Sequence, residues 1–270
     1  MRRLGGVVAV VVSVRKISLD NAGEMGYNCG MKDIDYFGNL WQSRKGVSPG
    51  HSPELWDSRA EEWIAELGED GLGKPTMQLR VRAAVGYLVN RGLVGADTSI
   101  IDIGCGPGLF VLEFAKYAKR VVGLDYSPKF AEYGRKLAEL RGLTNAEFLV
   151  EDFDTLDLDS AKLAGAFDLA FSSISPAVSS PSKMEKFMRL SRSWCNNISF
   201  AKVTDNPEIS KRSGRDGTGF YSLFNILWLS GYYPETYYYD ESRPGSICRY
   251  GSILWDVSQK DSRTNEENSL

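Results

Sequence analysis

The chain has 270 residues, a formal net charge of −3 at pH 7, 43% hydrophobic residues and 25% charged residues. These values are ordinary for a globular protein with one large domain, so a core of normal size can form. The acidic balance argues against a nucleic-acid partner, because neutralising phosphates requires a concentrated basic surface.

The histidine and cysteine contents argue against a metal site. His51 is the single histidine of the chain, which excludes a His-rich metal centre and disfavours a Ser-His-Asp triad. The four cysteines form no C-x-x-C pair and no zinc spacing. We therefore expect no metal, and the cysteine pattern fits a reducing cytoplasm.

Residues 1–30 differ in character from the rest of the chain. Arg2 and Arg3 precede an apolar run over 7–14, which is too short to span a bilayer. We expect a poorly ordered leader and no membrane anchor; translation that begins at Met25 or Met31 would make this leader a start-site artefact.

Residues 31–98 are expected to form an N-terminal helical cap. Ser52 and Pro53 are typical of a helix start, and apolar residues then recur at helical spacing to Leu67. A second helix is predicted over 75–90.

A glycine-rich loop follows the first predicted strand. The apolar run over 99–103 predicts a buried strand of a parallel sheet. Glycines at 104, 106 and 108 follow it, and a helix is predicted over 108–118. A strand, a glycine loop and a helix N-terminus together indicate a nucleotide-type site.

The alternation of strands and helices continues to the end of the chain. Strands are predicted over 120–124, 147–151, 167–172 and 197–203, and helices over 128–141, 182–193 and 220–230. Two last strands, over 235–239 and 252–257, are expected to form an antiparallel hairpin, and 259–270 a disordered tail. Such alternation predicts an α/β fold with a parallel sheet.

Three carboxylates stand at the carboxyl ends of three successive predicted strands, where ligands bind in open α/β sheets. They are Asp102, Asp125 and Asp152. The third glycine comes one residue earlier than in a dinucleotide fingerprint. Asp102 beside the loop would also repel a pyrophosphate and attract a cationic ligand.

Residues 102–108 resemble motif I of the class I S-adenosylmethionine-dependent methyltransferases, and Asp125 resembles the acid of motif II. The resemblance implies a Rossmann-like seven-stranded, mostly parallel sheet with helices on both faces, an antiparallel terminal strand and an N-terminal helical lid. It implies a cofactor-binding domain over 99–258, S-adenosyl-L-methionine as cofactor and S-adenosyl-L-homocysteine as product. The overall pattern is most similar to the ubiquinone/menaquinone-biosynthesis type, which implies a small-molecule acceptor.

The resemblance also implies roles for individual residues. Asp125 would bind the ribose hydroxyls, Tyr126 would pack on the adenine, and Asp102 would hold the methionine ammonium. Asp152 would meet the adenine amino group, and the backbone of Phe153 a ring nitrogen. The full set of expected cofactor-binding residues is Asp102, Gly104, Cys105, Gly106, Gly108, Asp125, Tyr126, Asp152, Phe153 and Ser172.

Candidates for the acceptor pocket are mainly aromatic. Core packing is the alternative for the aromatic candidates, and a polar turn is the alternative for Ser173. The candidates are Tyr36, Trp41, Trp56, Ser173 and Tyr221. The segment after the fourth strand, Phe171–Pro176, lacks the Asn/Asp-Pro-Pro-Tyr of amino-DNA methyltransferases, so nucleobase N-methylation loses its main support. No outstanding general base is present, and His51 and Tyr36 are the candidates.

Three other functions stay open at this point. A nicotinamide-dependent oxidoreductase is disfavoured by the loop spacing and by Asp102. A non-catalytic module would keep the S-adenosylmethionine site without an acceptor pocket, and a protein methyltransferase would present an open acidic groove. The sequence carries no signal for an oligomeric state.

Overall fold

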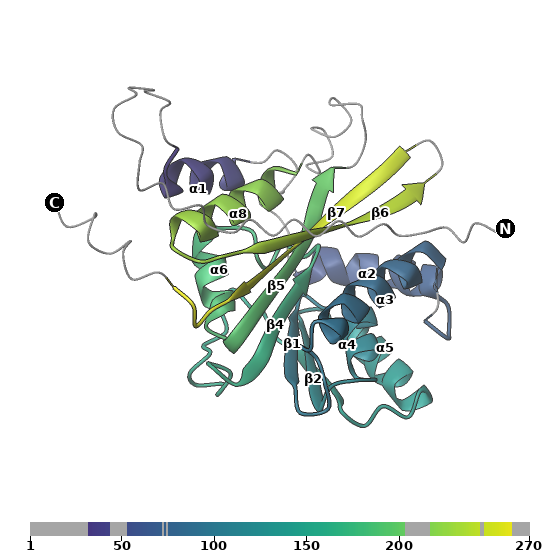
Figure 1. Ribbon diagram of the computed structural model, residues 1–270. Helices are drawn as coiled ribbons and strands as arrows, with labels where there is room; N and C mark the ends of the chain where they lie inside the picture. The colour runs from purple at the N-terminus through teal and green to yellow at the C-terminus, as the bar shows by residue number, and fades with distance from the viewer. Residues whose placement is uncertain are drawn as a thin grey trace, which may run out of the picture.

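The computed structural model of the chain describes residues 32–43, 53–71, 73, 75–202, 217–243 and 246–260. Helices and strands alternate along most of this part of the chain (Figure 1). The helices are α1 (Ile34–Gln42), α2 (Pro53–Leu67), α3 (Pro75–Asn90), α4 (Leu109–Phe114), α5 (Pro128–Leu140), α6 (Pro181–Met188) and α8 (Thr218–Leu229). The strands are β1 (Ser99–Ile103), β2 (Arg120–Asp125), β3 (Ala146–Val150), β4 (Phe167–Ser173), β5 (Ser191–Lys202), β6 (Glu235–Arg243) and β7 (Ser246–Asp256).

The strands form one seven-stranded sheet in the order β3-β2-β1-β4-β5-β7-β6. Strands β1 to β5 pair with one another in parallel. Strand β7 is antiparallel to both of its neighbours, β5 and β6. The predicted seven-stranded, mostly parallel sheet with an antiparallel end is therefore confirmed. The carboxyl ends of β1 to β4 meet at one edge, which brings the glycine loop and the predicted acids together.

Two apolar cores hold helices on the two faces of the sheet. Successive residues of β1 point to opposite faces, so Ile100 lies in one core and Ile101 in the other. The first core contains the buried faces of α3, α4 and α5, and the second those of α6 and α8. These two groups of helices lie on opposite sides of the sheet in Figure 1. The sheet is therefore a buried layer between two helical layers.

The helices of the N-terminal region contact different parts of the domain. Helix α1 packs against α8, α2 against α5, and α3 against α4 and β6. Residues Val81, Val85 and Leu88 of α3 are fully buried in the first core. Helix α3 is thus an integral layer of the domain, while α2 reaches the start of α5 at the edge that carries the glycine loop.

Two strands begin six residues earlier than the sequence predicted: β7 begins at Ser246 instead of residue 252, and the other difference is at β5. The helix predicted over 182–193 ends at Met188, and β5 begins at Ser191 instead of residue 197. Residues 191–196 are mixed in polarity, but they pair with β4 on one side and partly with β7 on the other. Pairing on both sides makes this segment a strand where local pattern suggested a helix end.

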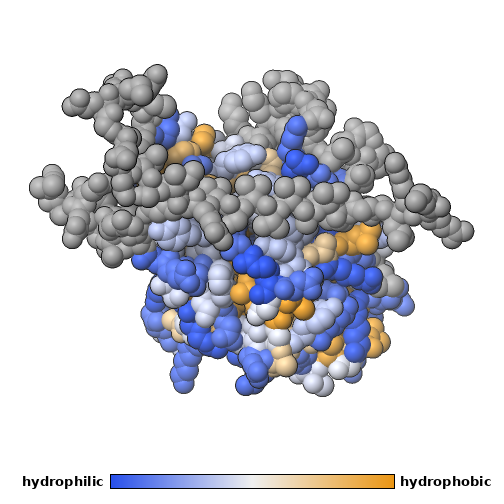
Figure 2. Space-filling view, in the orientation of Figure 1, coloured by the Kyte–Doolittle hydropathy of each residue, from blue (hydrophilic) through white to orange (hydrophobic). Residues whose placement is uncertain are grey.

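Several sequence predictions lie outside the described residues. They concern the leader over 1–30, His51, the cap at Ser52 and most of the tail over 259–270. None of the helices described here has the length and apolar character that crossing a bilayer requires. On the coloured part of the face in Figure 2, hydrophobic residues gather in small patches separated by hydrophilic ones, a normal pattern for a domain surface.

Candidate functional site

The glycine loop is fixed to the end of β2 by its own backbone. The amides of Gly104 and Cys105 donate to the carbonyl oxygen of Leu124 at 2.8 and 3.2 Å. The amide of Gly106 donates to Oδ2 of Asp125 at 2.8 Å. Sequence prediction placed loop and acid at the same edge, and the structure joins them directly.

The three glycines of the loop serve different purposes. All three have positive φ, which glycine adopts at no steric cost. A Cβ on Gly108 would also collide with the ring of Phe148, and one on Gly104 would collide with Ser175. A Cβ on Gly106 would meet no atom within 4 Å. Gly106 therefore borders open space, the side from which a ligand can approach the loop backbone.

Asp102 is a buried carboxyl group, and one of its oxygens accepts no hydrogen bond from the described residues. It is 2% exposed, and its Oδ1 has no hydrogen-bond partner within the described residues. Burial, and secondly the nearby Asp125 carboxylate, raises the pKa of Asp102 well above its usual value. A buried carboxylate without a partner is costly, so a cationic ligand group at this position would relieve it.

Asp125 accepts backbone hydrogen bonds on both carboxylate oxygens. Besides Gly106 on Oδ2, the amide of Ser127 donates to Oδ1 at 3.0 Å. Burial raises the pKa of Asp125, and these backbone donors oppose that shift. Each carboxylate oxygen has about two acceptor positions, so Asp125 keeps capacity for further donors such as ribose hydroxyls.

Tyr126 and Asp152 lie near Asp125, whereas Phe153 points away. Burial, together with the charges of Asp125, Asp152 and Asp154, raises the pKa of Tyr126. Oδ1 of Asp152 accepts the amide of Asp154 at 2.9 Å, which forms a tight turn after β3. The side chain of Phe153 is buried in the second core. A ligand could meet Phe153 only through its backbone, as the sequence analysis expected.

Cys105 packs as a small side chain. Its Sγ lies 2.8 Å from where a Cβ on Gly123 would stand, so a glycine in β2 makes room for the thiol. Burial, followed by the charges of Asp102 and Asp125, raises the pKa of Cys105 well above its usual value. The neutral thiol is therefore a packing group, and a thiolate nucleophile is disfavoured.

The two predicted serines at the end of β4 have different surroundings. Ser172 is fully buried, and its hydroxyl donates to the carbonyl oxygen of Ile103 at 2.9 Å, which ties β4 to β1. The Oγ of Ser173 is buried and has no hydrogen-bond partner in the part of the chain that the structure describes. Sequence reasoning missed Ser175, whose side chain lies against Gly104. Its signal was Pro176, because a proline restricts the residue before it to extended backbone.

The structure separates the aromatic candidates. Trp41 is 3% exposed within the second core, and Tyr36 lies on the exposed side of α1 with Lys32 over its ring. Trp56, on α2, makes an edge contact with Trp63. Tyr221 is half exposed on α8. These side chains do not form one group, and Trp63, the neighbour of Trp56, is 46% exposed.

A fourth acid, Asp57 of α2, lies at this edge, and the sequence analysis did not propose it as a site residue. Oδ1 of Asp57 accepts the hydroxyl of Ser127 at 2.8 Å, and Ser127 also caps α5. This bond, more than the nearby Lys129 ammonium, holds the pKa of Asp57 below its usual value. Helix α2 is thereby fixed next to the residue that bonds Asp125.

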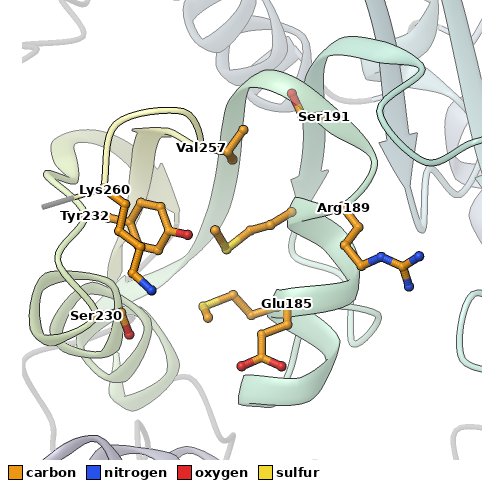
Figure 3. Close-up of a pocket in the computed structure, with 9 residues that line it drawn as sticks. Glu185, Arg189, Ser191, Ser230, Tyr232, Val257 and Lys260 are labelled. Atoms are coloured by element: carbon orange, nitrogen blue, oxygen red, sulfur yellow. The ribbon is translucent and has the colours of Figure 1, made fainter. Parts of the chain in front are cut away.

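A pocket of about 390 Å³ lies elsewhere, between α6, the end of α8 and the end of β7 (Figure 3). Ser191 at the start of β5 and Val257 after β7 line it, together with Tyr232 and Lys260. The start of β5 belongs to the sheet edge opposite the glycine loop. In Figure 3 Arg189 points away from Tyr232. This pocket is therefore separate from the candidate site.

Comparisons with known proteins agree with this geometry. A family model described as a methyltransferase domain matches residues 95–206, which include β1, the glycine loop and all three acids. Residues 95–206 are therefore similar to methyltransferase domains, and the seven-stranded sheet agrees with this similarity. The fold of the chain also resembles the solved structure of magnesium protoporphyrin IX methyltransferase from Synechocystis PCC 6803 with bound SAH. That match has a TM-score of 0.56 and 19% identity, and it covers 75% of this chain and 98% of the other.

The names of two curated relatives of this part of the chain specify different methyl acceptors. Human EEF1A lysine methyltransferase 2 is 32% identical over 119 residues, which are 42% of this chain and 47% of that protein. The 23S rRNA (uracil(1939)-C(5))-methyltransferase RlmD of Edwardsiella ictaluri is 31% identical over 118 residues, 42% of this chain and 26% of that protein. The chain spans less than half the length of these two relatives, so their names do not define its acceptor.

Proposed function

We propose that this protein transfers the methyl group of S-adenosylmethionine to an acceptor at the edge that carries the glycine loop. The single observation that carries the proposal is the buried Oδ1 of Asp102 beside that loop, to which none of the described residues donates a hydrogen bond. An ammonium group is the complement of such a carboxylate, and a pyrophosphate is not.

The residues present fit the cofactor along its length. Asp102 would hold the methionine ammonium, Asp125 the ribose hydroxyls, and Asp152 with the backbone of Phe153 the adenine. Gly106 leaves its backbone open to close approach, because no atom stands where its Cβ would be. The unused acceptor capacity of Asp125 supports the ribose assignment.

The cofactor supplies an electrophilic methyl group on a sulfonium. The acceptor atom forms a bond to the methyl carbon, the carbon–sulfur bond breaks with its electron pair moving to sulfur, and S-adenosylhomocysteine leaves. An amine or hydroxyl acceptor also loses one proton. In-line displacement depends mainly on positioning and on exclusion of water, so the protein can work without a strong general base.

A calorimetric titration with S-adenosylhomocysteine tests the cofactor assignment, with NADH as the competing ligand. We expect micromolar binding of S-adenosylhomocysteine and none of NADH. Asp125→Asn should weaken binding about tenfold or more, because one carboxylate acceptor becomes an amide donor. Asp159→Ala, an exposed acid paired with Arg189, is the matched control and should leave binding unchanged. Binding of NADH in place of S-adenosylhomocysteine would reject the proposal.

For the acceptor we propose a small molecule, as the similarity to the ubiquinone/menaquinone-biosynthesis type implies. A protein lysine is the second candidate, supported by the name of the human relative. Incubating the protein with methyl-labelled S-adenosylmethionine and a cell extract separates the two. Label in the fraction that passes a small-pore membrane supports a small molecule, and label in acid-precipitated protein supports a lysine.

A further inference from the structure

The segment after β4 lies directly against the first glycine of the loop. A Cβ on Gly104 would collide with Oγ of Ser175 and would lie 2.7 Å from its Cβ. The Ser175 side chain therefore covers the backbone two residues beyond Asp102. This contact joins β4 to the part of the site that the proposed function assigns to the amino-acid end of the cofactor.

The backbone around Ser175 is fixed in an unusual conformation. Ile174 has φ +56°, and a β-branched residue rarely adopts positive φ. Its amide donates to the carbonyl oxygen of Ile198 at 2.7 Å, and its side chain packs against the first core. Pro176 restricts Ser175 to extended backbone. Strained backbone of this kind is often found at functional sites, and here it lies directly before Ser175.

The hydroxyl of Ser175 has a proton to donate. Its Oγ accepts the amide of Ala177 at 3.2 Å, and within the described residues its hydrogen bonds include no acceptor for the O–H. A serine hydroxyl has one donor as well as its acceptor positions. The side chain is half-buried, so a ligand that lies on Gly104 can reach this donor.

We propose that Ser175 binds the amino-acid end of S-adenosylmethionine by donating its hydroxyl proton to the carboxylate. The inference rests on the proposed function. Strand β4 pairs with β1 on the side away from β2. A cofactor that meets Asp125 with its ribose and Asp102 with its ammonium has its amino-acid end on the β4 side. There Ser175 donates a hydrogen bond to the carboxylate of the cofactor, which would otherwise face the Asp102 carboxylate without a donor.

Two ligands that differ only in the amino-acid end test this assignment. S-adenosylhomocysteine carries that end, and 5′-methylthioadenosine shares the nucleoside and sulfur but lacks it. Ser175→Ala should weaken S-adenosylhomocysteine about tenfold, or about 1.4 kcal/mol, and leave 5′-methylthioadenosine within twofold. Asp125→Asn should weaken both ligands. Ser179→Ala, a half-buried serine of the same loop, is the matched control and should weaken neither.

The outcomes separate this inference from the proposed function. If wild type binds S-adenosylhomocysteine and Ser175→Ala binds both ligands normally, the inference is wrong and the proposed function stands. Equal weakening of both ligands by Ser175→Ala would assign the side chain a structural role and also reject the inference. If wild type binds neither ligand, the proposed function is wrong and the inference with it.

Discussion

At the residue scale, the site contains a buried carboxylate, and one of its oxygens has no hydrogen-bond donor among the described residues. Asp102 stands in a central strand, between Gly123 of β2 and Phe171 of β4 in register. No described side chain donates to its Oδ1. Because the raised pKa makes the folded state bind a proton more tightly than the unfolded chain does, this group lowers stability as pH rises above its unfolded pKa.

We therefore predict that Asp102→Asn stabilises the ligand-free protein and weakens cofactor binding. Near pH 8 the free energy of unfolding should rise by about 1–3 kcal/mol, because the Asp102 carboxyl ionises more easily in the unfolded chain, which favours unfolding, and a neutral amide removes this effect. Near pH 4 the gain should shrink, since the Asp102 carboxyl is then partly protonated in the unfolded chain as well, where its ordinary pKa is 3.8. Urea denaturation at the two pH values measures this; an equal or larger gain at pH 4 would contradict it.

At the element scale, α2 is joined to the sheet edge by a small set of polar contacts. Asp57 accepts the hydroxyl of Ser127, and Lys129 forms ion pairs with Asp57 and Glu61. The aromatic contact between Trp63 and Phe130 adds an apolar component to the same joint. Since Ser127 also donates its amide to Asp125, the position of α2 is coupled to the residue that we propose binds the ribose.

Asp57→Ala should loosen α2 without unfolding the domain. Loss of the bond to Ser127 is expected to cost about 1 kcal/mol and to raise amide hydrogen exchange across α2 several-fold. The matched control is Glu61→Ala, since Glu61 is 74% exposed and its pair with Lys129 should contribute little. Equal exchange in the two variants would show that Asp57 does not hold the helix.

Acid should reproduce the effect of Asp57→Ala in the wild type. The folded pKa of Asp57 is lowered, so its stabilisation is present above the unfolded pKa and is lost as pH falls through the folded value. The exchange difference between wild type and Asp57→Ala should therefore disappear well below pH 4.

At the scale of the whole molecule, the sheet is most deeply buried at its centre. Strands β1 and β4 are covered on both faces, whereas β3 is an edge strand with partly exposed residues. Its exposed Glu147 pairs with Arg120 of β2 at 2.8 Å, and a charge on an edge strand discourages pairing with other chains. Stability should accordingly fall from the centre of the sheet toward β3.

Native-state hydrogen exchange should show this gradient. Amides over 100–103 and 169–171 are expected to exchange only through global unfolding, and those over 146–150 through local opening at lower free energy. Measurements at increasing denaturant separate the two routes. Exchange of β3 with the same free energy and denaturant dependence as β1 would show a single cooperative unit and contradict the prediction.

The sequence predicted the parts of this molecule whose signals are local. The apolar run over 99–103, the glycines and Pro128 after Ser127 each determine their own surroundings, and the strand and helix starts there agree with the structure. The start of β5 could not be predicted from the local sequence, because residues 191–196 form a strand through pairing with the two neighbouring strands.

The candidate site divides in the same way. Asp102, Asp125 and Gly106 could be placed from the strand order alone, since each lies near the carboxyl end of a predicted strand. The contacts of Ser175 with Gly104 and of Asp57 with Ser127 join residues about 70 positions apart. Such pairs depend on tertiary packing, which spacing in one sequence does not encode.

The attachment of the glycine loop to β2 has a consequence for the energetics of ligand association. Three consecutive amides, of Gly104, Cys105 and Gly106, already have acceptors in the ligand-free protein. The backbone entropy of this turn is therefore lost when the chain folds, and association need not reduce it again. A ligand meets a preorganised surface, so the heat-capacity change of binding should reflect mainly the apolar area that ligand and loop bury.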